Sequence, residues 1–219
     1  MSGARLVVFD CDGTLVDSQA AIVESMAQAF GAAGLALPDP NMVRRIVGLS
    51  LPQALARLAP RASDAERATA LEAYKASFRT ARSDGRLEEP LYPGIDALLR
   101  RLHAGGWRLG VATGKSDRGL AHCLARHGVS ELFTTLQTAD RHPSKPHPAM
   151  LEAALFEADA APADAVMIGD TVFDIAMARA AGVRAIGVAW GYHEPAELRD
   201  AGAHGVASSA EELEAMIHD

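Results

Sequence analysis

Five short apolar segments recur along the chain, and each is followed by a polar or glycine-containing turn. They read RLVVFD, WRLGVATG, LFTTL, AVMIGD and RAIGVAW. Segments of this length that are apolar on both alternating positions are typical of strands buried on both faces, which is the pattern of a parallel sheet. The sequence therefore predicts a parallel sheet at the centre of the molecule.

Helical patterns lie between these strands. One begins after Pro93-Gly94, places apolar residues at helical spacing over 95–102, and ends at Gly105-Gly106 before the next strand. The same order of helix, glycine and strand returns in IAMARAAGVRAIGVAW. We therefore predict an α/β fold whose core is a doubly wound parallel sheet.

The stretch from residue 17 to residue 84 breaks this alternation, because it contains helical patterns and no strand pattern. Two helix starts within it carry the pattern of a capping box, Ser50-x-x-Gln53 and Ser63-x-x-Glu66. The stretch is longer than an ordinary crossover connection. We interpret it as an inserted α-helical cap domain; the alternative is a set of helices that merely covers one face of the sheet.

This interpretation divides the chain into two units. The α/β core comprises residues 1–16 and 85–219, and the cap domain comprises residues 17–84. The joints between them fall near residues 14–20 and 82–90.

Composition narrows the classes of partner. With 219 residues, of which 49% are hydrophobic, the chain can bury a sizeable core. The formal net charge of −7 and the lack of a basic run argue against nucleic acid as a partner. No apolar run approaches the ~20 residues that span a membrane, and no signal-peptide pattern opens the chain. The two cysteines, Cys11 and Cys123, suit a reducing compartment, so we expect a cytoplasmic protein, without predicting its oligomeric state.

Polar residues stand where several predicted strands end. Asp10 ends RLVVFD, Thr113 ends RLGVAT and Asp170 ends VMIGD. Lys145, in SKPHP, follows the LFTTL strand. Because ligands of open α/β sheets bind beyond the carboxyl ends of the strands, we expect these side chains to converge on one site.

Such a group of residues suits phosphoryl transfer. An ionised carboxylate such as Asp10 can attack phosphorus without a base, and Asp12 can protonate the departing alcohol and then activate water. Two carboxylates beside a phosphate require a cation, and Asp170 would complete an oxygen-ligand set for Mg²⁺. Thr113 can donate a hydrogen bond to a phosphoryl oxygen, and Lys145 can offset the negative charge.

Taken singly, these residues have simpler interpretations. Asp-Gly is a common turn dipeptide, Asp174 and Thr171 could be helix caps, and Lys145 could be a solvated lysine. These interpretations would all have to coincide at successive strand ends. For Asp17 and Ser18 we favour helix capping.

Other polar residues remain open. We interpret His142 and His147 as loop histidines, since no third ligand is spaced for a metal site. Lys115 and Arg118 could hold an anionic substrate or could be exposed charges in the first turn of a helix.

Four motifs in order, DCDGTLVDS, VATGKS, SKPHP and GDTVFD, resemble those of the haloacid dehalogenase superfamily of hydrolases. The match spans nearly the whole chain, and the helical insertion is similar to the mobile cap of the phosphoglycolate-phosphatase-like branch. The resemblance implies that Asp10 is the nucleophile and Asp12 the acid and base. It implies that Thr113, Gly114 and Lys145 bind the phosphate.

The resemblance also implies a magnesium site. Asp170 would bind Mg²⁺ together with the Asp10 side chain and the Asp12 backbone carbonyl, and Asp174 would be a ligand or lie near the metal. Arg44 and Arg45 lie in the cap segment, where the family places substrate-selecting residues, and either could bind a second anionic group. A solvated helix face is the other interpretation of both arginines.

These features predict a Mg²⁺-dependent phosphatase of a small phosphorylated metabolite, and the resemblance implies 2-phosphoglycolate as the first substrate. A dehalogenase is disfavoured, because halide leaves without protonation and such enzymes lack the equivalent of Asp12. Pyrophosphate, a sugar phosphate, a nucleoside monophosphate and a sugar phosphomutase reaction stay open. A non-catalytic regulatory protein of the same fold is disfavoured because no residue of the proposed site is missing.

Overall fold

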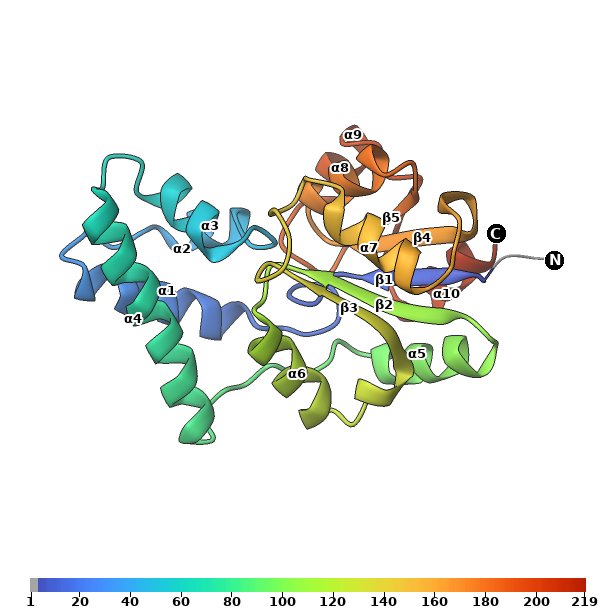
Figure 1. Ribbon diagram of the computed structural model, residues 1–219, viewed down its shortest axis with the longest axis horizontal. Helices are drawn as coiled ribbons and strands as arrows, with labels where there is room; N and C mark the ends of the chain where they lie inside the picture. The colour runs from blue at the N-terminus through green and yellow to red at the C-terminus, as the bar shows by residue number, and fades with distance from the viewer. Residues whose placement is uncertain (1–3) are drawn as a thin grey trace.

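A six-stranded parallel sheet forms the centre of the computed structural model, which describes residues 4–219 (Figure 1). Its strand order is β3-β2-β1-β4-β5-β6. The strands are β1 (Leu6–Phe9), β2 (Arg108–Thr113), β3 (Phe133–Thr138), β4 (Ala165–Gly169), β5 (Arg184–Val188) and β6 (Gly205–Ala207). The first strand therefore lies in the middle of the sheet, between β2 and β4.

Helices cover both faces of this sheet, as the doubly wound prediction requires (Figure 1). One face packs against α5 (Ile95–Ala104), α6 (Asp117–Arg126) and α10 (Ala210–His218). The other packs against α7 (Ala149–Glu157), α8 (Val172–Ala180) and α9 (Pro195–Asp200). Short 3-10 turns, Ser130–Leu132 and Pro162–Asp164, precede β3 and β4.

Strand β1 shows why the apolar segments carry no alternation. Val7 and Phe9 belong to the cluster on the α5 face, whereas Leu6 and Val8 belong to the cluster on the α7 face. All four side chains are fully buried. A strand covered on both sides must be apolar throughout, so the predicted α/β class is confirmed.

The prediction omitted one strand, β6. It has only three residues, Gly205–Ala207, and pairs with β5 alone at the edge of the sheet. An edge strand of this length has no apolar run to reveal it.

Four further helices form a separate layer beyond the carboxyl edge of the sheet (Figure 1). They are α1 (Gln19–Ala32), α2 (Pro40–Arg45), α3 (Leu51–Leu58) and α4 (Asp64–Ser83), and we call them the helical cap. The cap has a hydrophobic cluster of its own, which includes Met26, Phe30 and Leu55. The domain boundaries at residues 16/17 and 84/85 stay a prediction. No helix within residues 4–219 is long and apolar enough to cross a membrane.

Two of the predicted helix caps need correction. The Ser63 capping box is present, but Ser50 makes no side-chain cap; its backbone N–H instead donates to Ser144 Oγ of the core, at 2.7 Å. Asp17 accepts from the backbone N–H of Gln19 at 3.1 Å. Ser18 precedes α1 without capping it, because its hydroxyl is turned toward Asp12.

Candidate active site

The carboxyl ends of three adjacent strands bring the predicted site residues together. Asp10 follows β1, Thr113 ends β2 and Asp170 follows β4. The backbone N–H of Asp10 still donates to Ile168 on β4, at 2.9 Å, so this aspartate is held as rigidly as the strand that precedes it. Asp10, Thr113 and Asp170 are all fully buried.

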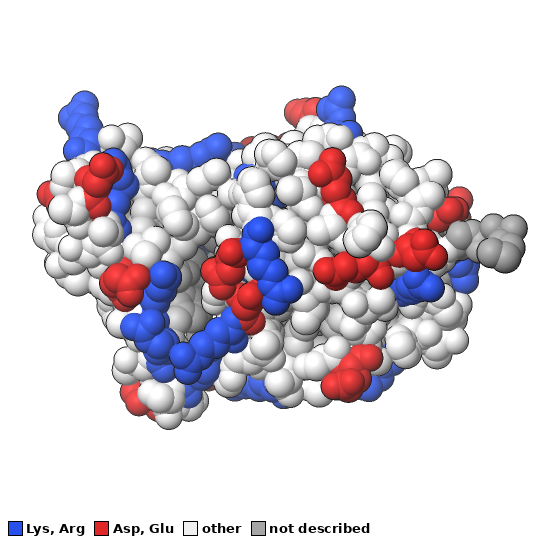
Figure 2. Space-filling model, viewed as in Figure 1, with Lys and Arg blue, Asp and Glu red and all other residues white. Residues whose placement is uncertain are grey.

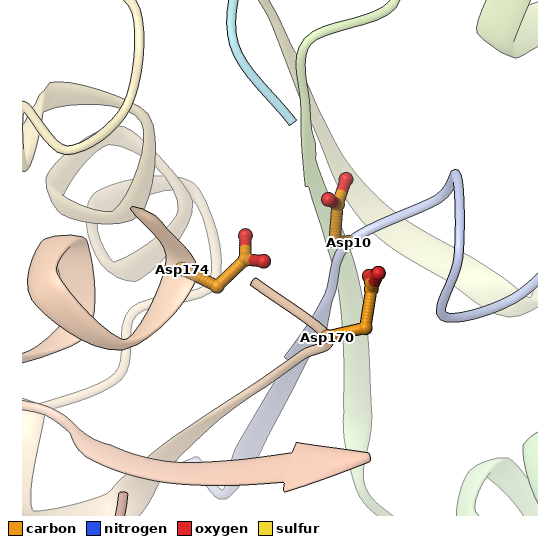
Figure 3. Close-up of side chains that lie close together, drawn as sticks. All are labelled: Asp10, Asp170 and Asp174. Atoms are coloured by element: carbon orange, nitrogen blue, oxygen red, sulfur yellow. The ribbon is translucent and has the colours of Figure 1, made fainter. Parts of the chain in front are cut away.

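Asp10, Asp170 and Asp174 form a buried acidic cluster at this edge (Figure 3). Each offers a carboxylate oxygen, and the three oxygens lie within 4.8 Å of one another. Burial raises the pKa of Asp10 to about 7, with Lys145 opposing the shift and Asp174 adding to it. Burial, followed by the charges of Asp174 and Asp10, also holds the pKa of Asp170 well above its usual range. Burial and mutual repulsion therefore disfavour the ionised form of these two carboxylates.

Hydrogen bonds from the backbone and from a threonine fix the orientation of these carboxylates. Thr14 Oγ1 donates to Asp170 Oδ1 at 2.7 Å, and the backbone N–H of Tyr192 donates to Asp170 Oδ2 at 2.9 Å. The N–H of Cys11 donates to Asp10 Oδ1 at 2.6 Å. Asp10 and Asp170 are thus preorganised by the turn that follows β1 and the loop that follows β5.

Lys145 supplies the positive charge nearest the cluster. Its ammonium lies 2.9 Å from Asp10 Oδ2 and 2.6 Å from Asp174 Oδ1, and its side chain is fully buried. Burial would lower the pKa of Lys145, but the two carboxylates outweigh it and raise the pKa. Thr171 holds the other oxygen of Asp174 through its backbone N–H and its hydroxyl, at 3.1 and 2.7 Å.

This donor set fits a divalent cation. It consists of carboxylate oxygens, which Mg²⁺ prefers, and one ammonium group cannot neutralise three buried carboxylates. Asp10 Oδ2 supports the fit: it lies at ion-pair distance from Lys145 but accepts no hydrogen bond of acceptable geometry among residues 4–219. The residues present could therefore hold the metal that the sequence predicts.

Asp12 stands apart from the cluster and has different partners. Its Oδ1 accepts a hydrogen bond from Ser18 Oγ and lies 2.9 Å from the ammonium of Lys115. The same ammonium lies 2.5 Å from Glu89 Oε1. The sequence does not predict this network: it leaves Lys115 as either a substrate-binding or an exposed residue, and no motif includes Glu89.

A segment of the helical cap lies directly over the acidic cluster. Gly48, with a φ of +95°, passes so close that a side chain there would reach within 3.2 Å of Thr171 Oγ1 and 3.8 Å of Asp10 Oδ2. On the β2 side, a side chain at Gly114 would meet the carbonyl oxygen of Leu49 at 2.5 Å. Glycine at both positions therefore permits the close approach of cap and core.

Beside this contact lies a cavity of about 590 Å³ between the cap and the core. Asp12 and Gly114 line it at the core side. Arg44 and Arg45 do not line it: Arg44 donates to Asn41 at 2.8 Å, and Arg45 forms a two-pronged ion pair with Glu197 of α9, at 2.5 and 2.6 Å. The structure thus gives Arg45 a contact between cap and core rather than a place in the cavity.

The two loop histidines do not form a metal site. His142 Nε2 is 2.7 Å from the Gln137 side-chain oxygen, and His147 accepts the backbone N–H of Ala149 at 3.2 Å. Among the described residues, the acidic cluster alone groups three potential metal ligands.

The structure thus combines a doubly wound α/β core, an acidic cluster with a buried lysine at its carboxyl edge, and a helical cap above that edge. The family model of haloacid dehalogenase-like hydrolases matches residues 7–188. The chain therefore belongs to the haloacid dehalogenase-like hydrolase family, which confirms the resemblance found in its motifs.

Known proteins agree with this assignment. The probable phosphatase IndB of Dickeya dadantii is 33% identical over 219 residues, covering 97% of this chain and 93% of that protein. A plasmid phosphoglycolate phosphatase of Cupriavidus necator is 32% identical, over 96% of this chain and 92% of its own length. The crystal structure of a predicted phosphatase from Clostridium acetobutylicum superposes with a TM-score of 0.88 at 27% identity, covering 99% of both chains.

Proposed function

We propose that the protein is a Mg²⁺-dependent phosphatase that hydrolyses a small phosphate monoester through an aspartyl-phosphate intermediate. The observation that carries this proposal is that Asp10 and Asp12, two residues apart in the chain, have different surroundings. Asp10 lies in the acidic cluster with Lys145, whereas Asp12 is held outside the cluster by Ser18 and Lys115. One carboxylate is therefore placed for attack on phosphorus, and the other is placed for proton transfer.

In the first step, a carboxylate oxygen of Asp10 forms a bond to phosphorus while the bond from phosphorus to the ester oxygen breaks. Asp12 gives its proton to that oxygen, so that a neutral alcohol leaves. Water then attacks the phosphorus of the aspartyl-phosphate; Asp12 takes up its proton, phosphate is released and Asp10 is regenerated. Lys145 and the hydroxyl of Thr113 stabilise the charge on the phosphoryl oxygens.

Magnesium held by Asp10, Asp170 and the backbone carbonyl of Asp12 would offset the repulsion between the phosphate and the carboxylates. Asp174 holds the ammonium of Lys145 in place through one carboxylate oxygen, while its other oxygen is fixed by Thr171. We also propose that the protein acts in the cytoplasm, as expected from its cysteine usage.

The proposed first substrate is 2-phosphoglycolate, which the names of several relatives support. The test is kcat/KM with Mg²⁺ at one pH across 2-phosphoglycolate, a sugar phosphate, a nucleoside monophosphate and pyrophosphate, together with p-nitrophenyl phosphate as a generic ester. We expect phosphate release from monoesters, with 2-phosphoglycolate among the best. Absence of hydrolysis of every compound would refute the proposal, and conversion of the sugar phosphate to an isomer would indicate a mutase.

Replacing Asp12 with alanine should slow the cleavage of alkyl phosphates far more than the cleavage of p-nitrophenyl phosphate. An alkoxide needs a proton in order to leave, and loss of a general acid costs about 10²- to 10⁴-fold in rate. Nitrophenolate leaves without one, so its kcat/KM, which reports the first chemical step, should fall much less. Equal losses for the two esters would show that Asp12 does not act as the acid.

A further inference from the structure

The cavity beside the acidic cluster has more positive charge than the transfer of one phosphate requires. Its acidic lining residues are Asp12 and Asp140, whereas its basic lining residues are Lys75, Lys115, Arg79, Arg82 and Arg118. Lys75 is paired with Glu72 at 3.2 Å. Lys115 is already neutralised by Asp12 and Glu89. The three arginines are therefore the source of the excess.

In the part of the chain that the structure describes, these three arginines have no ion-pair or hydrogen-bond partner. Within residues 4–219, no carboxylate lies within ion-pair distance of Arg79, Arg82 or Arg118, unlike the cap residue Lys75, which pairs with Glu72 at 3.2 Å. The Nε–H of Arg82 is buried and donates to no acceptor within residues 4–219. A buried guanidinium nitrogen without a partner costs free energy, which a bound anion would recover.

Arg82 and Arg118 act on a common region, although one lies on cap helix α4 and the other on core helix α6. Burial lowers the pKa of His122, and the positive charges of Arg82, Arg126 and Arg118 lower it further, against the opposing charge of Glu89. Figure 2 shows Lys and Arg side chains bordering the hollow between the cap and the core. An anion in the cavity could thus be approached from both sides.

The rest of the cavity wall is apolar on the cap side, with Met26, Leu71, Tyr74 and Phe78 among the lining residues. Its volume of about 590 Å³ is within the range of small-molecule sites and far exceeds that of a phosphate group. The leaving group of the ester, which departs past Asp12, would occupy this space.

We propose that Arg82 and Arg118 bind an oxyanion, either a carboxylate or a second phosphate, on the alcohol part of the substrate. The preferred substrates are then phosphate monoesters with a second negative charge, and esters of neutral alcohols are poor substrates. This inference rests on the proposed phosphatase function and deepens it. Because the two arginines come from different layers, the same anion would join the cap to the core.

The test compares matched pairs of esters that differ in charge. These are 2-phosphoglycolate against its neutral amide, and 3-phosphoglycerate against glycerol 3-phosphate, so that short and longer carboxylates are both represented; fructose 1,6-bisphosphate adds a second phosphate. We expect the wild-type protein to favour the anionic member of each pair. The double variant Arg82→Met, Arg118→Met should lose about 10- to 100-fold in kcat/KM for anionic esters, mainly through KM. It should change less than twofold for neutral esters.

Two further variants separate this role from a structural one. Arg86→Met is the matched control, because Arg86 lies just beyond α4, pairs with Asp84 at 2.8 Å and does not line the cavity. Arg82→Lys keeps the charge and should restore part of the preference. Equal losses for anionic and neutral esters would overturn the inference while leaving the phosphatase function intact. A wild-type protein that hydrolyses none of the esters would overturn the proposed function itself.

Discussion

Replacing Asp10 with asparagine should abolish phosphatase activity, with a fall in kcat/KM of about 10⁶-fold, the scale seen when a covalent nucleophile is removed. An amide oxygen is a poor nucleophile and its phosphorylated form has no route to hydrolysis by the same chemistry. The fold should survive, because the substitution removes a charge from a cluster in which burial and Asp174 already raise the pKa of Asp10 to about 7.

Acid quenching provides the direct measurement. Wild-type protein mixed with a substrate labelled in its phosphoryl group should retain label as an acid-stable, base-labile acyl phosphate, and Asp10→Asn should retain none. Asp200→Asn is the matched control, since Asp200 is an exposed residue at the end of α9 and does not belong to the cluster. Label on the Asp10→Asn protein, or appreciable turnover by it, would remove Asp10 from the role of nucleophile.

The sequence predicts the positions of Asp10, Asp170 and Lys145 well, because these positions follow from the order of the strands and from where each strand ends. Asp10 and Asp170 each follow a buried parallel strand directly, so their approach follows from the adjacency of β1 and β4. Lys145 was predicted from its motif and does reach Asp10 and Asp174. These positions depend on the local pattern of apolar strand segments and on the rule that ligands of α/β sheets bind beyond the carboxyl ends of the strands.

The surroundings of Asp12 were not predictable in the same way. Its contact with Ser18 joins two turns close in sequence, but its ion pair with Lys115, and that of Lys115 with Glu89, joins segments far apart in the chain. The position of Lys115 after a strand does not indicate that it will form ion pairs with two acidic residues, Asp12 and Glu89. Such networks depend on side-chain directions that appear only when the chain has folded.

The sequence also does not predict which arginines of the cap face the cavity. Substrate binding and a solvated helix face were both open for Arg44 and Arg45. In the structure Arg45 pairs with Glu197, and the arginines that line the cavity are Arg79, Arg82 and Arg118. Which side of a cap helix faces the core depends on how the helical cap sits on the sheet. Hydrophobic spacing identifies the helices but leaves that orientation open.

Removing divalent metal with a chelator should stop hydrolysis reversibly. The residues of the acidic cluster fit Mg²⁺, and charge stabilisation by a metal supplies several kcal/mol to such reactions, so the rate should fall about 10⁴-fold or more. Adding Mg²⁺ back should restore the rate, whereas Ca²⁺, which favours longer bonds and more ligands, should restore little. Full activity in excess chelator would contradict the magnesium site.

Thermal unfolding tests the same site without substrate. Three carboxylates buried around one lysine repel one another, so a cation bound among them stabilises the folded protein. At Mg²⁺ concentrations 100 times the dissociation constant, the gain is about 2.7 kcal/mol, which raises the melting temperature by roughly 5–10 °C for a chain of this size. Asp170→Asn should remove this Mg²⁺-dependent rise, because it deletes one of the charged ligands, whereas Asp200→Asn should keep it. If Asp170→Asn shows the same rise as the wild-type protein, the stabilising metal binds elsewhere and Asp170 is not its ligand.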